Sequence, residues 1–135
     1  MVQGSGKVVR AVAICLPALL LLLLLNGDVA ESRFYTVGDD AGWRDPSAVK
    51  NWAANKTFYP DDEFFFQFTP GQQSLMQVNE NGYRTCKYDP NLPTYLEGSI
   101  TFKLTGAGNY YFISTVNNGC ENGLKLWIKV SQPKN

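Results

Sequence analysis

The residues that could carry chemistry are concentrated in one polar stretch near the C-terminus, residues 114–123. The stretch holds serine, threonine and asparagine side chains and one cysteine, Cys120, between two segments with the composition of β-strands. Loops that join strands are common places for functional residues. Hydroxyl and amide groups can bind a polar ligand, and a thiol can form a disulfide or bind a metal ion. Histidine, the usual residue for acid–base catalysis and metal binding, is absent from all 135 residues.

This composition disfavours an enzyme. A nucleophile and base without histidine would have to combine Ser114 with Lys125 or with an acidic residue. The nearest cluster of acidic residues, 61–63, lies in a turn after Pro60 and is more simply explained as a solvated surface. We therefore expect no catalytic residues.

Residues 1–32 have the organisation of a secretory signal peptide. Two basic residues precede an apolar run, residues 11–25, which ends in seven leucines, and polar residues follow at once. The run is short for a membrane span of about 20 residues, so a signal anchor is the less favoured alternative. Cleavage after Ala30 and cleavage after Ser32 both remain open, with a preference for Ser32. We expect an exported chain that begins near residue 33.

Export explains the use of cysteine. Cys15 lies within the signal peptide, so Cys86 and Cys120 are the cysteines of the mature chain. Disulfides persist in oxidising compartments, and an even pair there predicts one bond. A metal site that uses both thiols is the rival interpretation, and it is disfavoured because no histidine can complete it.

The mature chain is electrically neutral. The protein has 12 basic and 12 acidic residues, and two of each precede residue 33. No basic patch indicates binding to nucleic acid or to anionic membranes. The single sequon, Asn55 with Thr57, predicts N-glycosylation in an exported chain.

Alternating apolar residues predict an all-β domain. The clearest alternation lies in residues 124–130, where leucine, isoleucine and valine alternate with lysine and tryptophan. Short strands separated by frequent turns are typical of a Greek-key β-sandwich. A helical turn is expected over residues 46–54, a polar turn over 79–84 and a loop over 87–98. We expect about seven strands, over residues 34–37, 57–59, 64–68, 75–78, 99–104, 109–113 and 124–130.

Several short blocks, in this order and spacing, resemble the phytocyanins, the plant branch of the cupredoxins. The blocks are Tyr35-Thr36-Val37-Gly38 with Gly42-Trp43, Trp52-Ala53 with Lys56-Thr57-Phe58 and the phenylalanines 64, 66 and 68, residues 71–78, Tyr83 with Cys86, and Gly108 to Leu126. The resemblance covers residues 33–131 and leaves residues 132–135 as a short tail. It implies a cupredoxin-like Greek-key β-sandwich with one disulfide between Cys86 and Cys120.

The resemblance also implies where copper would be bound. Electron-transferring phytocyanins hold copper with two histidines, a cysteine and a weak axial methionine or glutamine. When the chain is aligned on Cys120, Gln73 and Gly119 fall at the histidine positions, Ser114 at the cysteine and Leu124 at the axial ligand. These residues cannot bind copper as that site does, so we expect no type I copper and no cofactor. The chain is then most similar to early nodulin-like proteins, the phytocyanins that lack copper ligands, with the length of a plantacyanin.

We therefore expect a secreted, non-redox binding or structural module of the plant cell surface or apoplast, without a lipid anchor. A blue-copper electron carrier is the alternative. The partner would be a cell-wall glycan or a cell-surface protein, which could hold the chain at the outer face of the plasma membrane. The competing interpretation of the polar loop is that its asparagines and glycines only shape turns. The candidate ligand surface comprises Gln73, Ser114, Thr115, Asn117, Asn118 and Asn122, with Tyr88 and Tyr95 from the adjacent loop.

Overall fold

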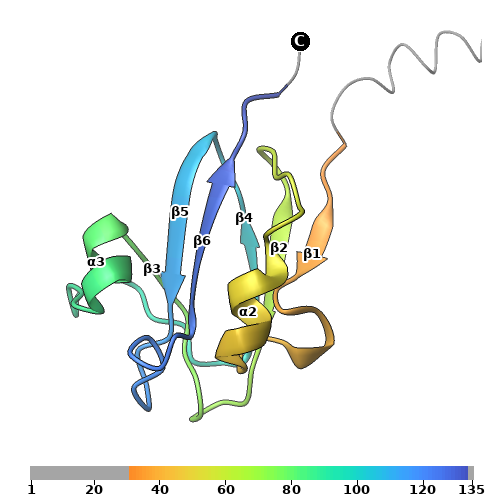
Figure 1. Cartoon of the computed structure of the whole chain (residues 1–135). Coiled ribbons are helices and arrows are strands. Elements are labelled where there is room, and N and C mark those ends of the chain that lie inside the picture. Colours follow the sequence, from red (N-terminus) through yellow and green to blue (C-terminus); the bar gives the residue numbers. More distant parts are fainter. Residues whose placement is uncertain (1–30, 134–135) are drawn as a thin grey trace, which may run out of the picture. The chain divides into compact units, whose positions relative to one another are not determined.

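A computed structural model describes residues 31–133, in which two sheets face each other with short helices beside them (Figure 1). The predicted signal peptide lies outside these residues, except for its last two positions. In the described part, no helix is long and apolar enough to cross a membrane.

Each sheet has three strands. The first has the order β1-β2-β4, with β1 parallel to β2 and β2 antiparallel to β4, and the second is the antiparallel sheet β3-β5-β6. The chain crosses between the sheets after β2, after β3 and after β4, as expected for a Greek-key sandwich. The elements are β1 (Phe34–Thr36), a 3₁₀ turn η1 (Asp39–Ala41), α2 (Pro46–Trp52), β2 (Glu63–Gln67), β3 (Met76–Val78), α3 (Glu80–Thr85), β4 (Ser99–Lys103), β5 (Gly108–Ile113) and β6 (Lys125–Val130).

The core lies between the sheets and is built from the inward faces of β2 and β6. Phe64 and Phe66 are fully buried, and Leu126 and Ile128 are buried opposite them. These residues occupy alternate positions because successive side chains of a strand point to opposite faces. The structure thus confirms the inward faces that the alternating pattern predicts.

Helix α2 confirms the helical turn expected after residue 45. Pro46 occupies the first helical turn, where its missing N–H leaves no hydrogen bond unmade. The carboxylate of Asp45 accepts hydrogen bonds from the hydroxyl of Ser47 at 2.8 Å and from its backbone N–H at 3.0 Å. These two donors hold the pKa of Asp45 below its usual value. Val49 and Trp52 are the buried residues of the helix and face the core.

The described chain has six strands rather than about seven, because residues 57–59 form no strand. Phe58 makes only an isolated bridge with Val130. The next residue, Tyr59, donates its backbone N–H to the carboxylate of Asp62 at 2.9 Å. That bond closes a turn into β2, and the pairing with the end of β6 is limited to Phe58, whose carbonyl accepts the backbone N–H of Ser131 at 2.8 Å.

Residues 79–84 were expected to form a polar turn, and this prediction was wrong because the segment forms helix α3. The side chain of Asn79 caps the helix by accepting a hydrogen bond from the backbone N–H of Gly82 at 2.8 Å. The helix ends at Thr85 and is capped by Cys86, whose φ of 60° is left-handed. Gly82 is its one buried residue, so the sequence lacks the apolar periodicity that predicts helices.

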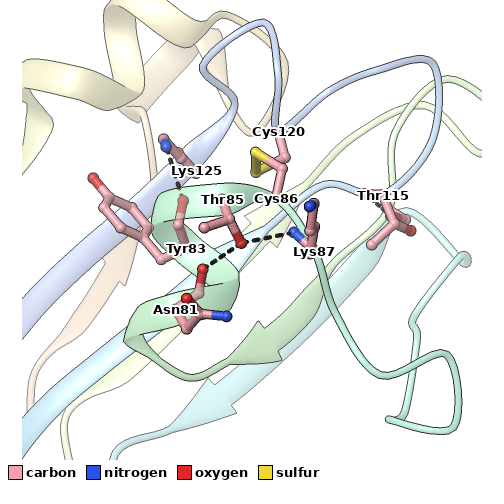
Figure 2. The surroundings of a disulfide bond; sticks show 9 residues. Asn81, Tyr83, Thr85, Cys86, Lys87, Thr115, Cys120 and Lys125 are labelled. Carbon is pink, nitrogen blue, oxygen red and sulfur yellow. Dashed lines mark hydrogen bonds between the residues drawn. A yellow bond between two sulfur atoms is a disulfide. The ribbon is translucent and has the colours of Figure 1, made fainter.

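The disulfide between Cys86 and Cys120 is present, which confirms the prediction; its Cα atoms are 5.8 Å apart. It joins the end of α3 to the loop between β5 and β6 (Figure 2). Beside it, the ammonium group of Lys125 donates to the backbone carbonyl of Tyr83 at 2.8 Å. Cys120 packs in a second cluster on the outer face of the second sheet, with Met76, Val78 and Ile113.

Removal of the disulfide by Cys86→Ala with Cys120→Ala should lower the free energy of unfolding by about 2–5 kcal/mol, because the unfolded chain gains conformational freedom. Chemical denaturation of the secreted protein measures the change. Lys87→Ala, beside Cys86 but outside the bond, is the control and should leave stability unchanged. Two free thiols in the wild-type protein, or an unchanged denaturation midpoint in the double variant, would contradict this prediction.

Candidate functional site

Gln73, Ser114, Gly119 and Leu124 lie together at the end of the sandwich where the β2–β3 loop meets the β5–β6 loop (Figure 1). The hydroxyl of Ser114 donates to the side-chain oxygen of Gln73 at 2.9 Å. Within the later loop, the backbone N–H of Ser114 donates to the carbonyl of Leu124 at 3.1 Å, and Leu124 N–H donates to the carbonyl of Gly119 at 2.8 Å. Four positions spread over 52 residues of sequence therefore form one cluster, which we call the Gln73 cluster.

Ser114 is fully buried, so it lies beneath the expected ligand surface and not on it. Its hydroxyl donates to Gln73 and accepts a hydrogen bond from the backbone N–H of Ser74 at 3.1 Å. The hydroxyl of Ser74 in turn accepts from the backbone N–H of Thr115 at 2.7 Å and contacts the Thr115 hydroxyl at 2.7 Å. These bonds satisfy the buried hydroxyls and join the two loops. Ser74 was not among the predicted site residues, because no sequence pattern indicates a buried serine within a loop.

Asn117 and Asn118 shape the loop. Both have left-handed backbone conformations, with φ of 52° and 54°, which asparagine adopts more readily than most residues. The side-chain N–H groups of Asn117 donate to the carbonyls of Gly71 at 3.2 Å and Gln72 at 2.9 Å. The Asn117 amide is therefore engaged within the protein. For these two residues the geometry favours the turn-shaping interpretation.

The remaining residues of the predicted ligand surface line hollows beside other parts of the sandwich. Asn122 lines a groove of about 500 Å³ beside α2. Tyr88 and Tyr95 are exposed, and they line two further hollows, of about 330 Å³ and 390 Å³. The linings of these three hollows do not include Gln73 or Ser114.

The residues considered for catalysis have structural contacts. Asp62 is buried, contrary to the expected solvated surface, and its two carboxylate oxygens accept backbone N–H groups of Arg33 and Tyr59, each at 2.9 Å. The exposed neighbour Asp61 lies 3.8 Å from the ammonium group of Lys103. The Ser114 hydroxyl bonds to Gln73 whereas the Lys125 ammonium bonds to Tyr83, so these two groups have different partners.

As possible metal ligands, the side chains of the Gln73 cluster offer only the amide oxygen of Gln73 and the hydroxyl of Ser114. Gly119 and Leu124 offer no ligand atom in their side chains. Both cysteines of the described part are used in the disulfide. Across residues 31–133, no group of three or more histidine, cysteine, aspartate or glutamate side chains could hold a metal ion. Type I copper is held by thiolate and imidazole, and this donor set does not fit it.

The chain is similar to plant proteins with this fold. Residues 43–124 match the family described as plastocyanin-like domain. Chemocyanin from Lilium longiflorum is 36% identical over 128 residues, which cover 95% of this chain and 98% of the relative. Early nodulin-like protein 22 from Arabidopsis thaliana is 33% identical over 141 residues, with 99% of this chain and 100% of the relative covered.

Among solved structures, cucumber stellacyanin with Cu2+ superposes with a TM-score of 0.70 and 28% identity. The match covers 78% of this chain and 100% of stellacyanin. The cupredoxin-like fold expected from the sequence is thereby confirmed, with six strands in the described part. The family match spans more than half of the chain, and the relatives match over nearly their full length. The chain therefore belongs to the plastocyanin-like domain family and is a phytocyanin.

Proposed function

We propose that this phytocyanin carries no type I copper and acts as a secreted, non-redox binding or structural module of the plant cell surface or apoplast. The observation that carries the proposal is the hydrogen bond between Ser114 and Gln73, which fills the centre of the Gln73 cluster with neutral oxygen groups. Neutral oxygen donors do not provide the soft ligands that copper needs in such a site. The module is proposed to act without catalysis, because Ser114 and Lys125 bond to different partners and the carboxylate of Asp62 is bonded to backbone N–H groups.

Close packing at Gly119 supports the proposal. A Cβ atom at this position would lie 2.6 Å from both Cβ and Oγ of Ser114 and 3.2 Å from the side-chain oxygen of Gln73. The first two distances are far shorter than ordinary van der Waals contacts. A histidine side chain at 119 would therefore require the cluster to open, so the loss of copper ligands and the packing of this end are consistent with each other.

Electron transfer is the alternative function. It is supported by the similarity to cucumber stellacyanin, whose solved structure is described with Cu2+. A blue copper site in this chain would need a thiolate from a residue other than Cys86 or Cys120, which the disulfide uses. Without histidine, it would also lack imidazole ligands. The chemistry of the side chains therefore favours the non-redox module over the electron carrier.

The first test is the visible spectrum of the secreted protein after addition of Cu(II). We expect no intense thiolate-to-copper absorption, because no free thiolate or imidazole is available in the mature chain. Cucumber stellacyanin, loaded in the same way, is the positive control. An intense blue band with one copper per chain would refute the non-redox proposal.

The second test concerns packing of the Gln73 cluster. Gly119→Ala should lower the free energy of unfolding by about 1–3 kcal/mol, because the added methyl group overlaps Ser114. Gly106→Ala is the matched control, since a Cβ atom there meets no heavy atom within 4 Å. Thermal or chemical denaturation compares the two variants. If Gly119→Ala is as stable as Gly106→Ala, the cluster is not closely packed and this support is lost.

The third test concerns export. The full chain expressed in plant cells should appear in the apoplastic fluid and begin at residue 31 or 33. It should also carry a glycan on Asn55, which is exposed in the turn that follows α2. Intact-mass measurement before and after deglycosylation determines both the first residue of the chain and the presence of the glycan. The Asn55→Gln variant, which has no acceptor, is the control. Retention of the uncleaved chain inside the cell would contradict the proposed location.

A further inference from the structure

A groove of about 500 Å³ lies beside β6, and its lining does not include the residues of the Gln73 cluster. One wall comes from α2, with Ser47 and Lys50, and the other includes Tyr83 of α3. Lys125 and Trp127 of β6 line it as well, together with Asn122. Figure 1 shows α2 beside β6, while α3 lies beside β3 of the same sheet.

The groove has a fixed aromatic surface. The rings of Tyr83 and Tyr111 are 5.5 Å apart between centroids, and those of Tyr111 and Trp127 are stacked at 6.2 Å with an interplanar angle of 17°. The indole N–H of Trp127 donates to the side-chain oxygen of Asn109 at 3.1 Å, which restrains the ring. Trp127 is nevertheless 53% exposed. A large apolar ring held in place at the surface is available to a ligand with a flat apolar face.

The groove is positively charged although the mature chain is neutral. Its lining includes Lys50 and Lys125 and contains no aspartate or glutamate. The ammonium group of Lys125 is held 4.5 Å from the centroid of the Tyr83 ring and donates to the Tyr83 carbonyl, which leaves further N–H groups for a ligand. The ion pair found in the described residues joins Lys103 to Asp61, so neither groove lysine is neutralised by a salt bridge there.

Tyr83 adds a hydrogen-bond donor and no charge. Burial, together with the nearby Tyr111, raises the pKa of Tyr83 above the usual value of a tyrosine. The phenol therefore stays protonated at neutral pH. Figure 2 shows its ring and the side chain of Lys125 beside each other next to α3.

We propose that this groove binds an acidic oligosaccharide, with a uronate carboxylate at Lys50 and Lys125 and the C–H face of a sugar ring on Trp127. The hydroxyl of Ser47 and the amide of Asn122 lie in the same lining and match the hydroxyl groups of a sugar. The unpaired positive charge selects an anionic ligand, and the fixed aromatic ring selects one with a flat apolar face. The inference rests on the proposed function as a binding module and gives that module a site and a ligand class.

The probe is a short oligogalacturonate, titrated against the secreted protein and followed by calorimetry. The titration uses Asn55→Gln protein, because Asn55 lies two residues after Ala53 of the groove lining and its glycan could compete. The methyl-esterified oligosaccharide keeps the rings and removes the charge, and it should bind about tenfold more weakly. Binding of the free acid should weaken as salt increases.

Two pairs of variants locate the site. Lys50→Glu should weaken binding about tenfold, whereas Lys87→Glu, the same change of an exposed lysine outside the groove, should not. Trp127→Ala should weaken it several-fold, whereas Phe34→Ala, which removes an exposed aromatic ring from the first sheet, should not. Circular dichroism of each variant verifies that the fold is retained.

The proposal is overturned if the oligogalacturonate does not bind or if acid and ester bind equally. It is also overturned if Lys50→Glu and Lys87→Glu have the same effect, or if an acidic peptide of equal charge binds as tightly as the sugar. These outcomes are independent of the copper spectrum. If the oligogalacturonate does not bind and no blue band forms, the proposed glycan site is refuted and the non-redox proposal stands. A blue band would refute the proposed function itself.

Discussion

Ser74 is the residue on which this end of the structure depends, because it is fully buried and its polar atoms are all bonded. Its N–H donates to the Ser114 hydroxyl, its carbonyl accepts the indole N–H of Trp43 at 2.8 Å, and its hydroxyl accepts from Thr115. A buried polar group without a partner is costly, so these bonds must form together. They connect the β2–β3 loop with the segment after η1 and with the β5–β6 loop.

The same bonds explain why the Gln73 cluster is a poor place for a ligand. Side chains that complete a buried hydrogen-bond network cannot bind a new partner without breaking it. The exposed asparagines above the network hold the loop in its left-handed turns. In this phytocyanin, the end of the sandwich that holds the Gln73 cluster is therefore closed by hydrogen bonds between its own loops.

The outer face of the second sheet has the opposite character. Near the disulfide it is covered by α3, which packs over Met76, Val78 and Ile113. Farther along, Lys125 and Trp127 of β6 line the groove, and Tyr111 stacks on Trp127. Charge and aromatic surface are concentrated there even though the protein has equal numbers of basic and acidic residues, 12 of each. The disulfide and the Lys125–Tyr83 hydrogen bond hold α3 against this sheet and so keep that wall of the groove in place.

The sequence alone was sufficient to predict the β-sandwich, its inward faces along β2 and β6 and the Cys86–Cys120 bond. Strand periodicity depends on a local pattern, and the cysteine pairing was inferred from the number of cysteines that follow the expected signal peptide. Helix α3 was missed because its signal is the single cap Asn79, with almost no buried face. The burial of Ser114, the hollows lined by Tyr88 and Tyr95 and the groove beside β6 were decided only by tertiary structure. Each depends on which loop or helix packs against which strand, and the residues that meet there are separated by tens of positions, with no periodic pattern to connect them.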